Sequence, residues 1–181
     1  MKSFFYSLWE TIEIGIIAII AVFIIRSFLI QPFLVNGASM EPNFSSGDYL
    51  IIDEISYRFR EPERGEVVVF RYPGNESTYF IKRVIGLPGE KVVFKNGKIF
   101  IFNKENPDGF FVKENYLSPE ALTSGQETIL KDNEYFVLGD NRGASFDSRM
   151  WGSLPKKEIV GLVRLRLWPF SQVLAVGKPV Y

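Results

Sequence analysis

The N-terminal part of the chain carries an apolar stretch that differs from everything after it. Residues 14–25 read IGIIAIIAVFII, and the apolar pattern resumes after Arg26 as SFLI and then QPFLV. At about 1.5 Å per helical residue, the span from residue 8 to residue 30 is long enough to cross a bilayer. We therefore predict a short cytoplasmic N-terminus over residues 1–10 and a single transmembrane helix over residues 11–30.

Two other interpretations of this segment stay open. A cleaved secretory signal has a shorter apolar run that ends at a small-x-small site, and neither feature is present here. A buried helix of a soluble protein needs partners on every side, which a chain of 181 residues rarely offers. Lys2 precedes the span and the next basic residue after Arg26 is Arg58, which favours a cytoplasmic N-terminus and an extracytoplasmic location for residues 31–181.

Beyond Pro32, short runs rich in β-branched and aromatic residues alternate with Gly, Pro and Asn. Such runs are typical of strands, and Asn96-Gly97 between two of them predicts a two-residue hairpin. We expect a mainly β fold: an antiparallel, barrel-like domain over residues 31–181 behind one N-terminal transmembrane helix, with a smaller inserted subdomain around residues 91–135. The expected strands cover residues 66–71, 79–85, 91–94, 98–102, 134–138 and 161–167, and the expected loops, with room for one short helical turn, cover 103–110 and 115–128.

The composition then narrows the chemistry. The chain has 21 basic and 21 acidic residues, so its zero net charge gives no reason to expect a nucleic-acid partner. It contains no Cys and no His, which excludes disulfides, thiolate nucleophiles, the Ser-His-Asp triad and almost every zinc hydrolase. A hydrolase working near neutral pH must therefore use a carboxylate, an α-amine or a lysine of lowered pKa as its base. No cofactor, metal or nucleotide site is expected.

A serine nucleophile can use a neutral lysine amine as its base when histidine is absent. Ser39 lies in the segment VNGASMEP, just after the predicted anchor, where Gly37 allows close approach of the backbone and Pro42 stiffens the exit. Met40 and Phe44 are its apolar neighbours in the sequence. The local sequence is also compatible with an ordinary turn serine.

Lys82 is the candidate base. Strand alternation places it on one face with Phe80 and Val84 and places Arg83 on the other face, so at least one cation lies among hydrophobic side chains. Desolvation disfavours the charged ammonium, which is the condition that a lysine base requires. The alternative is a lysine on an edge strand whose amine reaches water.

A third polar segment, GDNRGASFDSRMWG over residues 139–152, follows a predicted strand. Asp147 and Arg149 can pair at two points, and a serine hydroxyl here could orient an amine. A solvated polar turn is the alternative, although Phe146 and Trp151 favour packing.

Taken together, these blocks resemble the type I signal peptidases, the membrane-anchored Ser–Lys leader peptidases, of the compact Gram-positive kind. The resemblance covers nearly the whole chain and rests on one N-terminal anchor followed by GASMEP, GDYLI, RGEVVVFR, IKRVIGLPGE and GDNRGASFDSRMWG in this order. It implies a serine endopeptidase that removes N-terminal signal peptides from secreted preproteins and cuts after small residues at positions −3 and −1. Ser39 would be the nucleophile and Lys82 the general base.

The resemblance also implies supporting roles. Ser145 matches a serine that orients the lysine, and Asp147 and Arg149 match a structural ion pair near the site. The backbone N–H of Ser39 would be one oxyanion donor. Gly37 stands where some relatives carry a serine whose hydroxyl is a second donor, so that donor is left open and Gly37→Ser is expected to raise kcat modestly. The walls of the substrate pocket would be Phe33, Val35, Met40, Phe44, Phe80 and Ile81.

Two competing functions remain open from the sequence. A self-cleaving repressor of the Ser–Lys type needs a DNA-binding region, and the apolar anchor occupies that position here. A catalytically silent, membrane-anchored binding domain would keep the strands without needing Ser39 and Lys82. The expected partners are secretory preproteins and the lipid bilayer of the cell membrane, which the chain would cross once; the sequence does not fix the oligomeric state.

Overall fold

The computed structural model describes residues 9–20, 30–118 and 121–179 of the 181-residue chain. Residues 9–20 are helical, and their side chains are exposed. Residues 1–8 of the predicted cytoplasmic segment and residues 21–29 of the predicted anchor lie outside the described residues. Within the described ranges, no helix is both long enough and apolar enough to cross a membrane.

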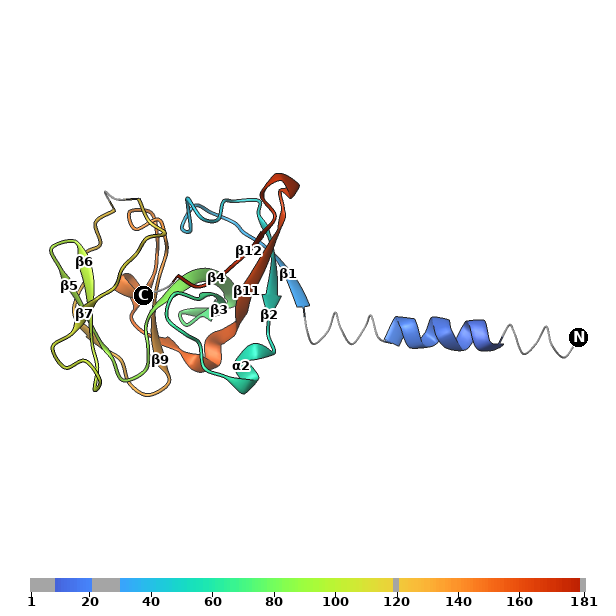
Figure 1. Ribbon diagram of the computed structural model, residues 1–181, viewed down its shortest axis with the longest axis horizontal. Helices are drawn as coiled ribbons and strands as arrows, with labels where there is room; N and C mark the ends of the chain where they lie inside the picture. Colours follow the sequence, from blue (N-terminus) through green and yellow to red (C-terminus); the bar gives the residue numbers. More distant parts are fainter. Residues whose placement is uncertain (1–8, 21–29, 119–120, 180–181) are drawn as a thin grey trace, which may run out of the picture.

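The rest of the chain is mainly antiparallel β-structure, as predicted, and is divided between two sheets (Figure 1). The large sheet has the order β1-β2-β11-β3-β4-β9-β10, with β12 paired to β11. Its strands are β1 (Ile30–Leu34), β2 (Tyr49–Asp53), β3 (Val67–Tyr72), β4 (Asn75–Gly86), β9 (Glu134–Leu138), β10 (Leu154–Pro155), β11 (Ile159–Trp168) and β12 (Leu174–Ala175).

The small sheet has the order β7-β6-β5-β8 and lies between β4 and β9 in the sequence. Its strands are β5 (Lys91–Lys95), β6 (Lys98–Phe102), β7 (Phe110–Phe111) and β8 (Thr128–Ile129). Asn96 and Gly97 connect β5 to β6 with φ values of 52° and 75°, which confirms the predicted hairpin. In Figure 1 this sheet and the group β1, β2, β11 and β12 lie on opposite sides of β4 and β9.

Apart from the helix over residues 9–20, the helical elements of the described chain are short and fall outside the two stretches where a helical turn was expected. They are α2 (Ser56–Phe59), α3 (Ser148–Trp151) and the 3-10 turns η1 (Lys156–Glu158) and η2 (Phe170–Gln172).

The large sheet differs from the expectation in two respects. Its strands form an open path, with no pairing between β1 and β10 among the described residues, so the barrel-like expectation was wrong on closure. In addition, Ile30 already begins β1, although the anchor was predicted to end there. An apolar run by itself does not reveal where a strand begins, because β1 forms only through its pairing with β2.

Side chains from both faces of β3 explain how this sheet is buried. Val67 and Val69 pack into one core cluster with β2 and the β1–β2 connection, whereas Val68 and Phe70 pack into a second one with β9. A third cluster joins the end of β4 to the small sheet. The first four residues of β3 and the last five of β4 therefore lie inside the molecule and form a rigid base for the polar groups that they carry.

A buried ion pair fixes β4 to the loop that follows β9. The Arg83 guanidinium donates from Nε and Nη2 to Asp140 at 2.9 and 2.6 Å, and from Nη1 to the Gly65 carbonyl oxygen at 2.9 Å. The Asn43 amide donates to the same carboxylate at 2.9 Å. Because the Asp140 side chain has no exposed area, this network holds β4, the β1–β2 connection and the post-β9 loop in one register.

Removing the arginine should be strongly destabilising. We expect Arg83→Met to lower the free energy of unfolding by roughly 3–5 kcal/mol, because it leaves the Asp140 charge buried without its partner. The control is Lys131→Met, since Lys131 is 84% exposed and 3.9 Å from Glu134, and such surface pairs contribute about 1 kcal/mol at most. Urea denaturation of both variants makes the comparison, and equal losses would contradict the role given to the Arg83–Asp140 pair.

Candidate active site

The connection between β1 and β2 presents Ser39 on a turn. The strand pairing continues past β1, with Val35 N–H donating to Asp48 O at 2.9 Å, and the chain then folds into a turn in which Glu41 N–H donates to Ala38 O at 3.2 Å. The side chains of Met40 and Phe44 are 1% and 4% exposed and fix this turn to the core. The half-buried Ser39 side chain is left at the surface of a pocket.

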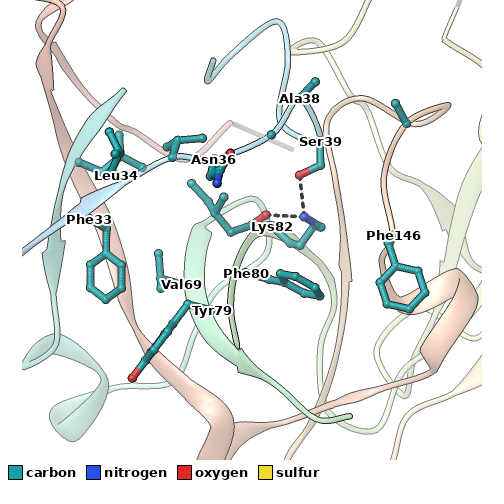
Figure 2. A pocket seen from close by; sticks show the side chains of 15 residues that line it. Phe33, Leu34, Asn36, Ala38, Ser39, Val69, Tyr79, Phe80, Lys82 and Phe146 are labelled. Atoms are coloured by element: carbon teal, nitrogen blue, oxygen red, sulfur yellow. Dashed lines mark hydrogen bonds between the residues drawn. The ribbon is translucent and has the colours of Figure 1, made fainter. Parts of the chain in front are cut away.

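Lys82 approaches Ser39 from β4. Its Nζ lies 2.7 Å from Ser39 Oγ, 2.8 Å from the Ile81 carbonyl oxygen and 5.3 Å from the centre of the Phe80 ring. Figure 2 shows the hydroxyl and the amine pointing toward each other. Strand β4 pairs with β3 at Lys82 and with β9 only from Arg83 onward, but Lys82 is only 3% exposed, so the alternative of a lysine whose amine reaches water is wrong.

The electrostatics of Lys82 follow from this position. Burial lowers its pKa from 10.5 to about 8, while the negative charges of Asp147 and Asp140 oppose the shift. A substantial fraction of the amine is therefore neutral at mildly alkaline pH, which a proton acceptor requires. The pair of side chains has the arrangement of a nucleophile and its base.

The polar segment after β9 lies against the nucleophile turn. Gly139 is packed so closely that a Cβ at this position would overlap with the Ser39 carbonyl oxygen and with Ser145 Oγ. Ser145 is thus placed beside the site, and its buried Oγ has no hydrogen-bond partner among the described residues, Lys82 included. Only glycine permits two backbone segments to meet at this distance.

Asp147 and Arg149 form a bidentate pair in this segment. Arg149 Nε and Nη2 each donate to the Asp147 carboxylate at 2.8 Å, and the Gly139 N–H donates to it at 3.1 Å. The carboxylate also accepts from the Arg149 N–H at 3.3 Å as the N-cap of α3. The pair therefore braces the loop from Gly139 to Asp147.

A pocket of about 320 Å³ opens beside Ser39 and Lys82, between the end of β1 and β4. In Figure 2, Phe33 and Tyr79 lie on one side of it and Phe80 and Phe146 on the other. The Phe33 and Tyr79 rings are in contact, with centroids 5.6 Å apart. The pocket is thus mostly apolar, with the reactive groups at one end.

The predicted pocket walls fall into two groups. Phe33, Val35, Phe80 and Ile81 line the pocket, whereas Met40 and Phe44 do not and belong to the core behind it. The resemblance implied Met40 and Phe44 as walls, but their side chains are buried in the core, where they hold the turn. The wall residues that were not predicted are Leu34, Asn36, Ala38, Leu50, Val69, Tyr79, Ala144 and Phe146.

Gly37 has a φ of +98°, a conformation that L side chains rarely adopt. Its N–H donates to Ser46 Oγ at 3.3 Å, and the space around it is open. A serine at this position would therefore be strained, at a cost of roughly 1–2 kcal/mol, although no atom would clash. This strain counts against the gain in kcat that the resemblance suggested for Gly37→Ser, and the sequence alone does not reveal the backbone angle.

Sequence reasoning also missed two polar residues that surround the nucleophile. Asn141 N–H donates to the Ser39 carbonyl oxygen at 3.0 Å, and its side-chain amide donates to the Ala38 carbonyl oxygen at 3.1 Å. Asp140 precedes it and is held by Arg83. Their place in the polar segment after β9 was the available signal, but a segment this rich in polar residues does not indicate which of them face Ser39.

The described ranges contain no group of three or more acidic side chains that could hold a metal ion.

Comparisons with known proteins agree with this geometry. The family described as "Signal peptidase, peptidase S26" matches residues 8–168. The chain is 39% identical to a probable signal peptidase I-2 of Synechocystis over 90% of this chain and 75% of that protein, and 32% identical to signal peptidase IB of Staphylococcus aureus over 86% and 87%. The crystal structure of a signal peptidase I from Enterococcus faecalis is 28% identical, with a TM-score of 0.46 over 57% of this chain and 97% of that one. The family match and the two matches to curated signal peptidases show that the chain belongs to the signal peptidase family, peptidase S26.

Proposed function

We propose that this protein is a membrane-anchored serine endopeptidase that removes N-terminal signal peptides from secreted preproteins. Ser39 is the nucleophile and Lys82 the general base, and cleavage follows small residues at positions −3 and −1 of the signal peptide. The observation that carries the proposal is the 2.7 Å contact between Ser39 Oγ and a lysine amine that is 3% exposed.

In the first step, Ser39 Oγ attacks the scissile carbonyl carbon while its proton passes to the neutral Lys82 amine. A neutral amine has two N–H groups and one lone pair. The contact with the Ile81 carbonyl oxygen engages one N–H, which leaves the lone pair free to face Ser39 Oγ. When the tetrahedral intermediate collapses, the Lys82 ammonium gives its proton to the departing amine of the mature protein.

The developing oxyanion needs hydrogen-bond donors at the nucleophile turn. In the described part of the chain, the backbone N–H of Ser39 donates to no protein group, so it is available for this purpose. Removing a single donor of this kind costs about 3–4 kcal/mol of transition-state stabilisation in a serine protease. Because Gly37 carries no hydroxyl, the Ser39 N–H has a particularly large role here.

Ser145 and the Asp147–Arg149 pair support this machinery. The unpartnered Ser145 hydroxyl is a candidate acceptor for the second N–H of Lys82 as the amine becomes an ammonium. The pairing of Asp147 with Arg149 compensates a charge that would otherwise raise the pKa of Lys82 further. In the second step, water attacks the carbonyl carbon of the acyl-enzyme while its proton passes to Lys82. Lys82 then returns this proton to Ser39 Oγ as the ester bond breaks and the signal peptide is released.

The pocket suits an extended peptide with small side chains. One edge of β1 pairs with β2, and residues 79–82 of β4 pair with β3, so the other edge of each segment borders the pocket and can hydrogen bond to a peptide. In an extended chain, residues −1 and −3 project to the same side about 7 Å apart. Both side chains would share the single apolar volume beside Ser39, which favours small residues.

Exposed apolar side chains support a location at the membrane surface. Leu34, Tyr49 and Trp168 are paired neighbours across β1, β2 and β11, and they are 56%, 47% and 47% exposed. Phe170, at 77% exposure, stacks edge-on against Trp168. Aromatic residues favour the bilayer interface, and Leu34 also lines the pocket. With residues 11–29 as a single-pass anchor and the N-terminus in the cytoplasm, Ser39 would meet the end of a membrane-embedded signal peptide at the outer surface.

The first experiment is cleavage of a secretory preprotein by the full-length chain in detergent with lipid, with the cut site read by mass spectrometry. We expect the wild type to cut after a small-x-small sequence. Ser39→Ala and Lys82→Met should lose at least about 10³-fold in kcat, because nucleophile and base act as one unit. An inactive but folded wild type would favour the alternative of an anchored binding domain, and an active, folded Lys82→Met variant would refute the assignment of the base.

The pH dependence tests the protonation state of Lys82. Its pKa of about 8 means that the neutral fraction falls about tenfold for each pH unit below 8. We therefore expect kcat/KM to be about 100-fold lower at pH 6 than at its alkaline plateau. A peptide substrate without titratable side chains isolates the enzyme's contribution, and a flat profile between pH 6 and 8 is incompatible with a lysine base.

The same burial should make Lys82 unfavourable for stability. Its pKa is 10.5 when unfolded and about 8 when folded, so between these values the unfolded state binds the extra proton and the unfolding free energy rises with pH. Below pH 8, Lys82→Met should therefore be more stable than the wild type by about 3 kcal/mol, and the difference should shrink toward pH 10.5. Urea denaturation of both proteins at pH 7 and pH 10 measures it. A pH-independent difference would contradict the lowered pKa.

A further inference from the structure

Asn141 contacts the nucleophile turn at two consecutive carbonyl groups. Its side-chain Nδ2 donates to Ala38 O at 3.1 Å, and its backbone N–H donates to Ser39 O at 3.0 Å. The residue lies in the loop after β9, about 100 positions away in sequence, and takes no part in lining the pocket. One residue thus holds the peptide groups on both sides of the Ser39 Cα.

The geometry of a trans peptide gives these contacts a specific consequence. The Ala38 carbonyl and the Ser39 N–H belong to the same planar group and point in opposite directions. A donor that holds the Ala38 oxygen therefore turns the Ser39 N–H away from the post-β9 loop. Since this N–H donates to no group among the described residues, it is free on the side that faces away from Asn141.

The turn itself cannot supply this orientation relative to Lys82. The Ala38 oxygen also accepts the Glu41 N–H at 3.2 Å, but that bond lies inside the turn and would move with it. Asn141, in contrast, follows Asp140, which Arg83 holds through two hydrogen bonds of 2.9 and 2.6 Å. Because Arg83 is the neighbour of Lys82 on β4, the Asn141 contacts fix the turn to the strand that carries the base.

We propose that Asn141 is a positioning residue that orients the Ala38–Ser39 peptide group so that the Ser39 N–H serves as the oxyanion donor. This inference rests on the proposed function and deepens it. Asn141 would have no contact with the substrate. It would lower the barrier by fixing a donor before the negative charge develops.

Asn141→Asp is the decisive variant, because it keeps the shape of the side chain and the backbone N–H but replaces the amide donor by an oxygen that repels the Ala38 carbonyl. We expect kcat at the alkaline plateau to fall about 10-fold to 100-fold, with KM changed less than about twofold. Asn141→Ala should show a smaller fall in the same direction. Asn103→Ala serves as the matched control, since the Asn103 amide also donates to a single acceptor, Glu90 Oε1 at 3.0 Å, but lies in the turn after β6.

A second measurement separates positioning of the donor from a general loss of structure. Ser39 Oγ can add to the carbonyl carbon of a signal-peptide fragment that ends in alaninal, and with the serine proton moved to the former carbonyl oxygen the product is a hemiacetal. The matching peptide alcohol binds without forming a covalent bond. Asn141→Asp should weaken binding of the peptide aldehyde by about the same factor by which it lowers kcat/KM. Binding of the peptide alcohol should be unchanged. If the wild type cleaves and Asn141→Asp keeps its kcat, or if both peptides lose affinity equally, the inference is wrong. A wild type that cleaves nothing would instead overturn the proposed function.

Discussion

A buried lysine amine loses its proton near pH 8, well below its usual range, only when the structure excludes water and balances the nearby negative charges. Both conditions act at Lys82, which is 3% exposed and lies close enough to Asp140 and Asp147 for their charges to raise its pKa. Each carboxylate is held by an arginine through two hydrogen bonds, Asp140 by Arg83 and Asp147 by Arg149. Burial therefore remains the dominant influence on the pKa of Lys82. The proposed mechanism thus has a base although the chain contains no histidine.

The same two ion pairs also determine where the backbone runs. Arg83 follows Lys82 on β4, and its pairing with Asp140 draws the post-β9 loop against the β1–β2 turn. At the contact, Gly139 has no room for a side chain, and Asn141 holds the carbonyl groups beside Ser39. The turn that carries Ser39 and its N–H, the strand that carries Lys82 and the loop that carries Asn141 are thus three segments that are rigid only together, so a change in any one should affect the other two.

The location of the pocket fits the proposed action on a membrane-bound substrate. Leu34 belongs both to the pocket wall and to the row of exposed apolar residues that continues through Tyr49 and Trp168. A peptide that emerges from a bilayer next to this row would enter the pocket in an extended conformation, without a long diffusive search. The short distance in sequence between β1 and Ser39 keeps the nucleophile near the same surface.

The sequence by itself determined those features that depend on neighbouring residues. The strands over 98–102 and 134–138, the hairpin at Asn96-Gly97 and the chemistry left without His and Cys all follow from local pattern and composition. The tertiary structure alone decided that the sheet stays open, that Met40 and Phe44 support the turn, and that Asn141 faces Ala38. The motifs suggested Ser39 and Lys82 separately, but their 2.7 Å contact joins residues 43 positions apart. Propensity and periodicity act over a few residues, whereas desolvation, backbone angles and loop contacts depend on segments that meet only when the chain has folded.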